Sequence, residues 1–210
     1  MQVIGGPAWL DTDRYDISAK AEGRASAAEM LGPMMQTLLE ERFQLKVHVE
    51  AKESLVYALT IARTAPKLTS AKDGECVPLD LNNRELWGTG GPTPCGMPKT
   101  SIKDGLTILE MAGATMEEFA GRMPLVQSGR PVVDKTGLGG RYNIHLEFVR
   151  ELSSGSIRIN GVDQPSPLPA DTAGPSVFTA LEDQLGLRLR PDKAPLNVVV
   201  IDSVQKPVAN

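Results

Sequence analysis

Aromatic residues are scarce in this chain, at 4% of 210 residues, so its cores must be built from aliphatic and methionine side chains. The hydrophobic fraction of 41% and the charged fraction of 23% are those of an ordinary globular protein. At this length the chain has room for one large domain or two small ones.

An excess of basic residues is also lacking, because 22 Lys and Arg face 26 Asp and Glu and give a net charge of −4. Nucleic-acid binding needs a basic surface, so we expect no nucleic-acid partner. No run of 18 apolar residues occurs, so we expect no membrane span. No signal segment precedes residues 1–4, which resemble the middle of a strand. The protein is either cytosolic or exported with its leader trimmed, and we expect the latter.

Only two cysteines are present, Cys76 and Cys95, on either side of a loop rich in proline and glycine. A zinc site needs four ligands at short paired intervals, which this spacing does not provide. A disulfide would close the loop, stabilise the fold by about 3 kcal/mol on the chain-entropy model, and indicate an oxidising compartment. The alternative is two unpaired thiols, and we expect the disulfide.

Residues 1–62 are expected to form a first α/β module with a truncated front. Alternation of apolar residues predicts a strand over residues 15–23. Ser26 and Glu29 have the spacing of a capping box, which predicts a helix that runs to about Phe43.

The start of the helix and the pairing of the strands after it are the two remaining features of this module. Pro33 is tolerated best at a helix start, so the helix begins either after Ser26 or at Pro33. Strands over residues 45–50 and 55–61 follow so closely that a hairpin is expected.

The middle of the chain is divided into a loop over residues 63–104, stapled by the disulfide, and a second module over residues 105–150. A strand is expected at residues 106–111. Thr115 and Glu118 predict a second capped helix. Residues 130–148 then read as a hairpin whose glycines serve positive backbone dihedral angles.

A linker over residues 151–174, with a short strand at residues 156–159, leads to a third module over residues 175–210. Pro175 favours a helix start, and Gly186 is expected to end that helix. Two last strands are expected, over residues 187–190 and 196–204.

An internal repeat relates the first and third modules at a constant offset of 142 positions. TLLEERFQLKV, from Thr37, aligns with TALEDQLGLRL, from Thr179, and both run from a helix into a strand. The sequence therefore predicts an α+β fold of repeated α-β-β modules, with small helices packed on antiparallel or mixed sheets. Chance similarity between two amphipathic segments is the alternative.

Residues able to carry chemistry are few. His48 and His145 fall on the polar faces of strands, where a solvated histidine is the usual interpretation and a general base needs a partner in space. Asp202 falls on an apolar strand face, so it is expected to be partly buried, either paired with an arginine or as a perturbed acid. These three residues are the candidate catalytic groups.

Three carboxylates close together, Asp11, Asp13 and Asp16, are the candidate metal site, because hard oxygen ligands suit calcium. The alternative is capping and turn chemistry on an exposed loop. No dinucleotide or phosphate-binding glycine motif is present, so calcium is the one candidate cofactor.

Four stretches resemble the soil-associated, largely acidobacterial family of exported domains of unknown function: GGPAWLDTDRYDI, PVVDKTGLGGRYNIHLEF, GPSVFTALEDQLGLRL and VVVIDSVQKP. The resemblance covers nearly the whole chain and implies an exported protein, periplasmic or extracellular, with no catalytic residues to transfer. The element order also resembles the short N-terminal domains of secretins and TonB-dependent receptors, which implies protein contacts at the envelope.

The expected function is therefore an exported binding or interaction domain that contacts a protein or small-molecule partner through a module face or a sheet edge. The alternative is a small calcium-assisted hydrolase that acts on an ester or a lactone.

Overall fold

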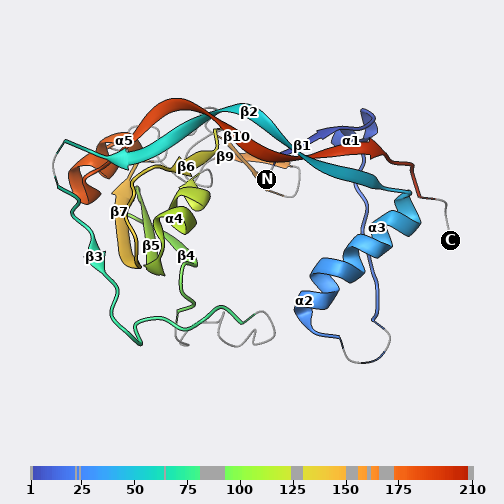
Figure 1. Cartoon of the computed structure of the whole chain (residues 1–210), viewed down its shortest axis with the longest axis horizontal. Helices are drawn as coiled ribbons and strands as arrows, with labels where there is room; N and C mark the ends of the chain where they lie inside the picture. Colours follow the sequence, from blue (N-terminus) through green and yellow to red (C-terminus); the bar gives the residue numbers. More distant parts are fainter. Residues whose placement is uncertain are drawn as a thin grey trace. The chain divides into compact units, whose positions relative to one another are not determined.

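The computed structural model describes residues 2–21, 23, 25–63, 65–80, 93–123, 130–149, 156–159, 162–165 and 173–207. It confirms the α+β class, with two four-stranded sheets in the orders β1-β10-β2-β6 and β3-β7-β5-β4 and a two-stranded sheet β8-β9 (Figure 1). The chain divides into a first unit of Met1–Ser54, Asp80–Arg84 and Ala194–Asn210 and a second unit of Leu55–Leu79 and Glu85–Lys193. The division into three modules stays a prediction.

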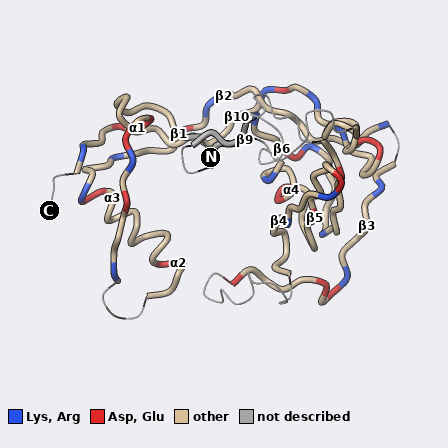
Figure 2. The backbone as a smooth tube through the Cα atoms, turned by 180° about the vertical axis from the view of Figure 1, so that it is seen from behind, with Lys and Arg blue, Asp and Glu red and all other residues tan. Residues whose placement is uncertain are grey.

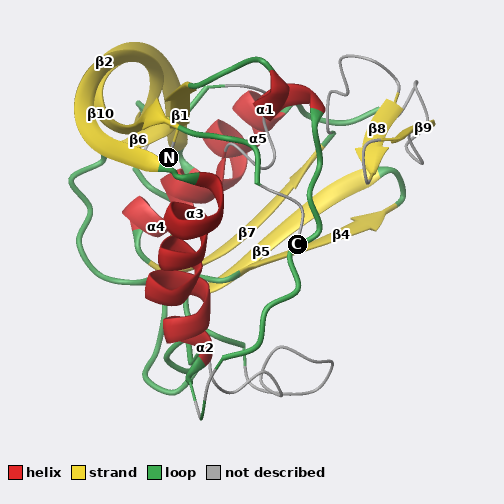
Figure 3. Ribbon diagram, turned by 90° about the vertical axis from the view of Figure 1, so that its right-hand side faces the viewer, coloured by secondary structure: helices red, strands yellow, loops and turns green. Residues whose placement is uncertain are grey.

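One continuous helix dominates the first unit and consists of α2 (Ala27–Glu29), the π-helical segment η1 (Met30–Met34) and α3 (Met35–Phe43) (Figure 3). Ser26 Oγ accepts a hydrogen bond from the Glu29 amide, and the Glu29 carboxylate accepts one from the Ser26 amide. The first capping box is therefore confirmed, and the helix does not begin at Pro33. Pro33 lies inside η1, where a wider turn suits a residue without an amide hydrogen.

β1 (Gln2–Gly5) and α1 (Trp9–Thr12) precede this helix. The strand expected over residues 15–23 is wrong, because the described residues of that stretch form none. Alternation alone produced that prediction, but a strand also needs a neighbour with which to pair.

Two long strands, β2 (Lys46–Ile61) and β10 (Leu187–Ser203), each run from one unit into the other. The expected hairpin over residues 45–61 and the expected pair of strands over residues 187–204 are both wrong. Polar residues and prolines interrupt the apolar alternation and resemble turns, but β2 and β10 are neighbours in one sheet, which keeps both backbones extended.

β1 and β6 (Val132–Asp134) form the edges of this sheet, each parallel to its neighbour. β1 pairs with β10, and Val3 lies opposite Val199. β6 pairs with β2, and Val132 lies opposite Tyr57. The hairpin expected over residues 130–148 is therefore wrong, because β6 and β7 (Tyr142–Phe148) belong to different sheets.

The turn between β6 and β7 has the local chemistry that its sequence suggests. Asp134 Oδ1 accepts a hydrogen bond from the Thr136 amide at 2.8 Å, and Thr136 Oγ1 accepts one from the Leu138 amide at 3.1 Å. Gly137 and Gly140 have positive φ angles of 70° and 90°, whereas Gly139 does not. Positive dihedrals thus explain two of the three glycines.

The second sheet is antiparallel and consists of β3 (Thr69–Ser70), β7, β5 (Leu106–Ala114) and β4 (Pro98–Lys103). The strand expected at residues 106–111 is confirmed, and so is the capping box that opens α4 (Met116–Arg122). The sequence did not predict β3 or β4 within residues 63–104. Both are edge strands, and β4 carries the lysines and proline that are common at sheet edges.

The core of the second unit lies between this sheet and two helical segments, α4 and α5 (Val177–Ala180) with its π-helical continuation η4 (Leu181–Leu185). Figure 1 shows β4, β5 and β7 side by side. Gly186 ends η4 with a φ of 66°, as the sequence predicted. β8 (Ser156–Ile159) confirms the short strand in the linker and pairs with β9 (Val162–Pro165).

No helix in the described part of the chain has the length and apolar character needed to cross a membrane. Figure 2 shows Lys and Arg interspersed with Asp and Glu along the backbone of each unit. This mixture agrees with the small negative net charge.

Candidate interaction surface

An open groove of about 250 Å³ lies on the first unit between the helix and the start of β2. Two of its apolar side chains are well exposed, Leu31 by 70% and Val47 by 43%. Gln36, on the same groove, donates a hydrogen bond to Glu40 at 2.8 Å. The residues that line this open groove are Leu31, Gly32, Met35, Gln36, Leu39, Glu40, Leu45 and Val47. Exposed apolar side chains together with a few polar groups are typical of a protein interface.

Three aromatic residues hold the segment after α1 against the end of α3. The Tyr15 ring packs edge-on against Phe43 at 5.3 Å and against Trp9 at 6.1 Å, measured between ring centroids. The Phe43 carbonyl also accepts a hydrogen bond from the Gln205 amide at 2.7 Å. The positions of Tyr15 and of the residues next to it are therefore fixed relative to the helix.

The three candidate calcium ligands do not converge in this structure. Asp13 pairs with Lys206 at 2.6 Å, and this partner holds the pKa of the Asp13 carboxyl below its usual value. The stabilisation is present above the unfolded pKa and is lost as the pH falls through the lower folded value. Asp11 lies on α1, and Asp16 lies in the segment after it. Among the described residues no three His, Cys, Asp or Glu are placed to hold a metal ion, and the calcium site stays a prediction.

Two candidate catalytic residues, His48 and Asp202, are brought together on the first unit. His48 Nδ1 lies 2.9 Å from Asp202 Oδ1, and His48 Nε2 lies 4.0 Å from Glu50 Oε2. Asp202 is exposed, so its expected burial is wrong, and its partner is a histidine instead of an arginine. An exposed pair of this kind is common on a wet strand face and contributes little to stability.

The third candidate catalytic residue, His145, lies on β7 of the second unit. Its ring contacts Glu147 at 3.0 Å and Glu110 at 3.5 Å, and its side chain is 56% exposed, as the alternation predicted. It lines a shallow depression of about 530 Å³ together with Glu75, Lys99 and Asn143. The depression is open, and its lining is mixed, because Met111, Ala112 and Ile144 lie among the polar residues.

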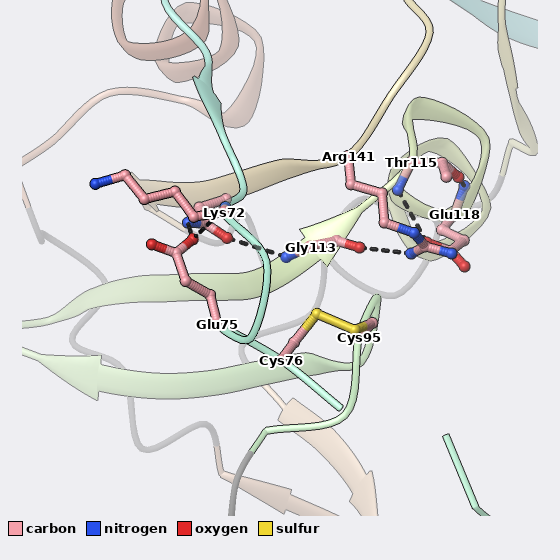
Figure 4. Close-up of a disulfide and its surroundings, with 9 residues drawn as sticks. Lys72, Glu75, Cys76, Cys95, Gly113, Thr115, Glu118 and Arg141 are labelled. Atoms are coloured by element: carbon pink, nitrogen blue, oxygen red, sulfur yellow. Dashed lines mark hydrogen bonds and ion pairs between the residues drawn. A yellow bond between two sulfur atoms is a disulfide. The ribbon is translucent and has the colours of Figure 1, made fainter. Parts of the chain in front are cut away.

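The disulfide between Cys76 and Cys95 is confirmed, with 5.0 Å between the two Cα atoms (Figure 4). It packs against Gly113, at which a Cβ atom would collide with Cys76 Sγ. The Gly113 carbonyl accepts a hydrogen bond from Arg141 Nη1 at 2.6 Å, and the same Nη1 lies 3.2 Å from a Glu118 carboxylate oxygen. The disulfide, the irregular end of β5 and the capped helix thus form one cluster.

Asn143 binds this cluster from the neighbouring strand. Its Oδ1 accepts a hydrogen bond from the Gly113 amide at 3.0 Å, and its Nδ2 donates to Glu75 at 2.6 Å. The pKa of Glu75 is lowered by the hydrogen bond from the Lys72 amide and, to a smaller extent, by the one from Asn143. The cluster is structural and anchors β5 to β7.

The sequence interpretation missed the open groove. The predicted α-β-β module packs one face of this helix on a sheet, and no exposed apolar surface was predicted beside it. A signal was present, since six of the ten residues from Met30 to Leu39 are Met or Leu. That is a wider apolar arc than one contact face of a surface helix requires.

No curated protein and no solved structure gives a significant match to the chain. The family described as "Protein of unknown function (DUF3738)" matches residues 1–204. Since this match spans nearly the whole sequence, with the disulfide and the open groove inside it, the chain belongs to that family.

Proposed function

We propose that the chain is an exported binding domain that contacts a protein partner through the open groove of its first unit. The observation that carries the proposal is the exposure of large apolar side chains that line one groove, with Leu31 70% and Val47 43% exposed. Met30 and Met34, on the same helix, are about as exposed as Val47. Fully burying one such side chain contributes about 1.5–3 kcal/mol. A partner that covers several of them therefore gains a substantial part of its affinity there.

Export is supported by the disulfide, because disulfides persist in oxidising compartments. The resemblance in element order to the short N-terminal domains of secretins and TonB-dependent receptors favours a place in the bacterial envelope. An exported domain with an apolar groove fits a contact between proteins better than a contact with a charged small molecule.

Site-specific photo-crosslinking in the native host cell tests this function. A benzophenone amino acid replaces Leu31 in one variant and Ile102, which is 55% exposed on β4, in a matched control. We expect a discrete crosslinked protein band from position 31 and none from position 102. Loss of the band when Met35→Asp, which changes a lining residue, is added would support the groove. No band from position 31 would overturn the proposal.

The alternative, a calcium-assisted hydrolase of esters or lactones, has one favourable observation. A carboxylate 2.9 Å from an imidazole nitrogen, as in His48 and Asp202, can orient a general base. A screen with small ester and lactone substrates, with and without EDTA, tests it. Turnover that EDTA abolishes would favour the hydrolase, and a calcium titration without heat would exclude the metal.

A further inference from the structure

The two units are built from two copies of one repeat, and the sequence similarity at an offset of 142 covers only part of each copy. The first copy runs from β1 through β2, and the second runs from β6 through β10. Gly32-Pro33 and Gly174-Pro175 extend that similarity towards the N-terminus. In each copy a helix is followed by a long strand, α3 by β2 and η4 by β10. Each helix also ends at a left-handed residue at the equivalent position, Gln44 with φ 49° and Gly186 with φ 66°.

Strand pairing gives an independent test of this equivalence. In both units the first strand of one copy pairs in parallel with the second half of the long strand of the other copy. Val3 lies opposite Val199 and Val132 lies opposite Tyr57, and Tyr57 and Val199 occupy equivalent positions at the offset of 142. The two copies therefore share their register as well as their order of elements.

A second pair of matching segments lies between the first strand and the helix of each copy. Residues 14–17 are Arg-Tyr-Asp-Ile, and residues 141–144 are Arg-Tyr-Asn-Ile. In the second unit this segment opens β7, which pairs antiparallel with β5, so that Ile144 lies opposite Met111. In the first unit, within the described residues, no strand lies beside residues 14–17.

Burial differs between the copies accordingly. Ile144 is 3% exposed and its equivalent Ile17 is 45% exposed, while Val132 is 7% exposed and its equivalent Val3 is 60% exposed. Six residues from α5, η4 and β10 are buried: Val177, Ala180, Leu181, Leu185, Leu187 and Leu189. None of their equivalents in the first unit is buried, namely Met35, Leu38, Leu39, Phe43, Leu45 and Val47. Four of these line the open groove.

The segment that covers these positions in the second unit is the hairpin β4–β5 with helix α4. β5 pairs with β7, and α4 packs against β6. This segment supplies a large part of the core cluster, namely Leu109, Met111, Ala114, Met116, Phe119, Ala120 and Met123. The described part of the first unit contains no counterpart of it.

We propose that the first unit binds a polypeptide segment from outside residues 1–210 that is folded as a β-hairpin followed by a helix, with the chemistry of β4–β5–α4. Its second strand pairs antiparallel with residues 14–17 and covers the open groove, and its helix packs against β1. The inference rests on the proposed function, because it names the kind of partner that the groove takes.

Polar complementarity specifies this segment further. Arg141 binds the Gly113 carbonyl at the end of β5 and the Glu118 carboxylate in the first turn of α4. Among the described residues, the equivalent Arg14 binds only the carbonyls of Asp11 and Asp13, in its own loop, at 3.2 and 2.9 Å. The bound segment therefore carries an acidic residue in the first turn of its helix, opposite Arg14.

Asp16 supplies the second polar contact. Its equivalent Asn143 accepts a hydrogen bond from the Gly113 amide, whereas Asp16 has no hydrogen-bond partner among the residues that the structure describes. A carboxylate at this position accepts the amide of the incoming strand in the same way. A second copy of the chain does not supply the segment, because its β4–β5–α4 is already buried in its own second unit.

A labelled peptide with the sequence of residues 98–123 is the probe, titrated into the full chain by fluorescence anisotropy. We expect saturable binding of one peptide per chain. Ile17→Asp and Val3→Asp should each weaken this binding at least about tenfold, because each places a charge in the new interface. Arg14→Ala should weaken it by roughly tenfold, because a charge-assisted hydrogen bond is lost. Ile102→Asp, at an exposed site of the second unit, should leave affinity unchanged. A control peptide with Leu109→Asp and Met111→Asp should not bind.

The outcomes separate this inference from the function on which it rests. No saturable binding, or binding that Ile17→Asp and Arg14→Ala leave unchanged, overturns the inference even if crosslinking from position 31 finds a partner. A crosslink failure with intact peptide binding overturns the proposed function alone. Sedimentation tests whether the groove binds a second molecule of this chain. If the chain dimerises and Leu31→Asp restores the monomer, the groove is a dimer interface and the inference is overturned.

Discussion

At the scale of single residues, the two left-handed helix ends show how the same backbone tolerates different side chains. Gln44 keeps a side chain at φ 49°, and that side chain donates a hydrogen bond to the Glu41 carbonyl at 2.8 Å. Gly186 has no such freedom, because a Cβ atom there would lie 2.7 Å from the Ala65 carbonyl oxygen. The second unit therefore requires glycine where the first does not.

Gly186→Ala is expected to lower the free energy of unfolding by more than about 1 kcal/mol, because it adds left-handed strain to a close backbone contact. Gly139→Ala is the matched control, since its φ is not positive and a Cβ atom meets nothing within 4 Å. Urea denaturation of both variants measures the difference. Equal midpoints for the two would contradict the role assigned to Gly186.

At the scale of elements, the local signals in the sequence were dependable and the long-range ones were not. Both capping boxes and the Gly186 helix end were predicted correctly, because each depends on atoms within a few residues. The continuity of β2 and β10 and the pairing of β6 with β2 depend on strands distant in sequence, so apolar alternation could not reveal them.

The candidate site shows the same limit. His48 and Asp202 lie 154 positions apart in the sequence. Sequence patterns identified each of them as a candidate but could not predict the contact between them. The open groove depends on a missing neighbour, and a single sequence cannot show which apolar surface stays uncovered.

The cluster of the disulfide, Gly113 and Arg141 at the end of β5 leads to a prediction about stability. Replacing Cys76 and Cys95 together by serine should lower the free energy of unfolding by about 3 kcal/mol, because the open chain gains conformational freedom when unfolded. Gly113→Ala should also destabilise the oxidised protein, since its Cβ would collide with Cys76 Sγ. Denaturation with and without a reducing agent measures both. A wild-type midpoint that reductant leaves unchanged would contradict the prediction.

At the scale of the whole molecule, the two units differ in how much apolar surface they bury. The core cluster belongs to the second unit, whereas α3 has no buried residue. Secondary structure with few buried contacts opens at a lower free energy than a packed core.

Hydrogen exchange followed by mass spectrometry should therefore find faster exchange in Met35–Phe43 than in Met116–Arg122 or Tyr142–Phe148. The second unit acts as the internal control in the same experiment. Equal protection of α3 and α4 would show that the first unit is as stable as the second without a partner. The peptide of residues 98–123 should slow exchange in α3 when it binds.

The passage of β2 and β10 from one unit to the other has a consequence for dissecting the protein. Each unit takes the first half of one long strand and the second half of the other, so no cut between the copies releases a complete unit. The chain resembles a strand-exchanged dimer that has been covalently joined. Separately produced halves would each be incomplete, and they would regain structure only by complementing each other.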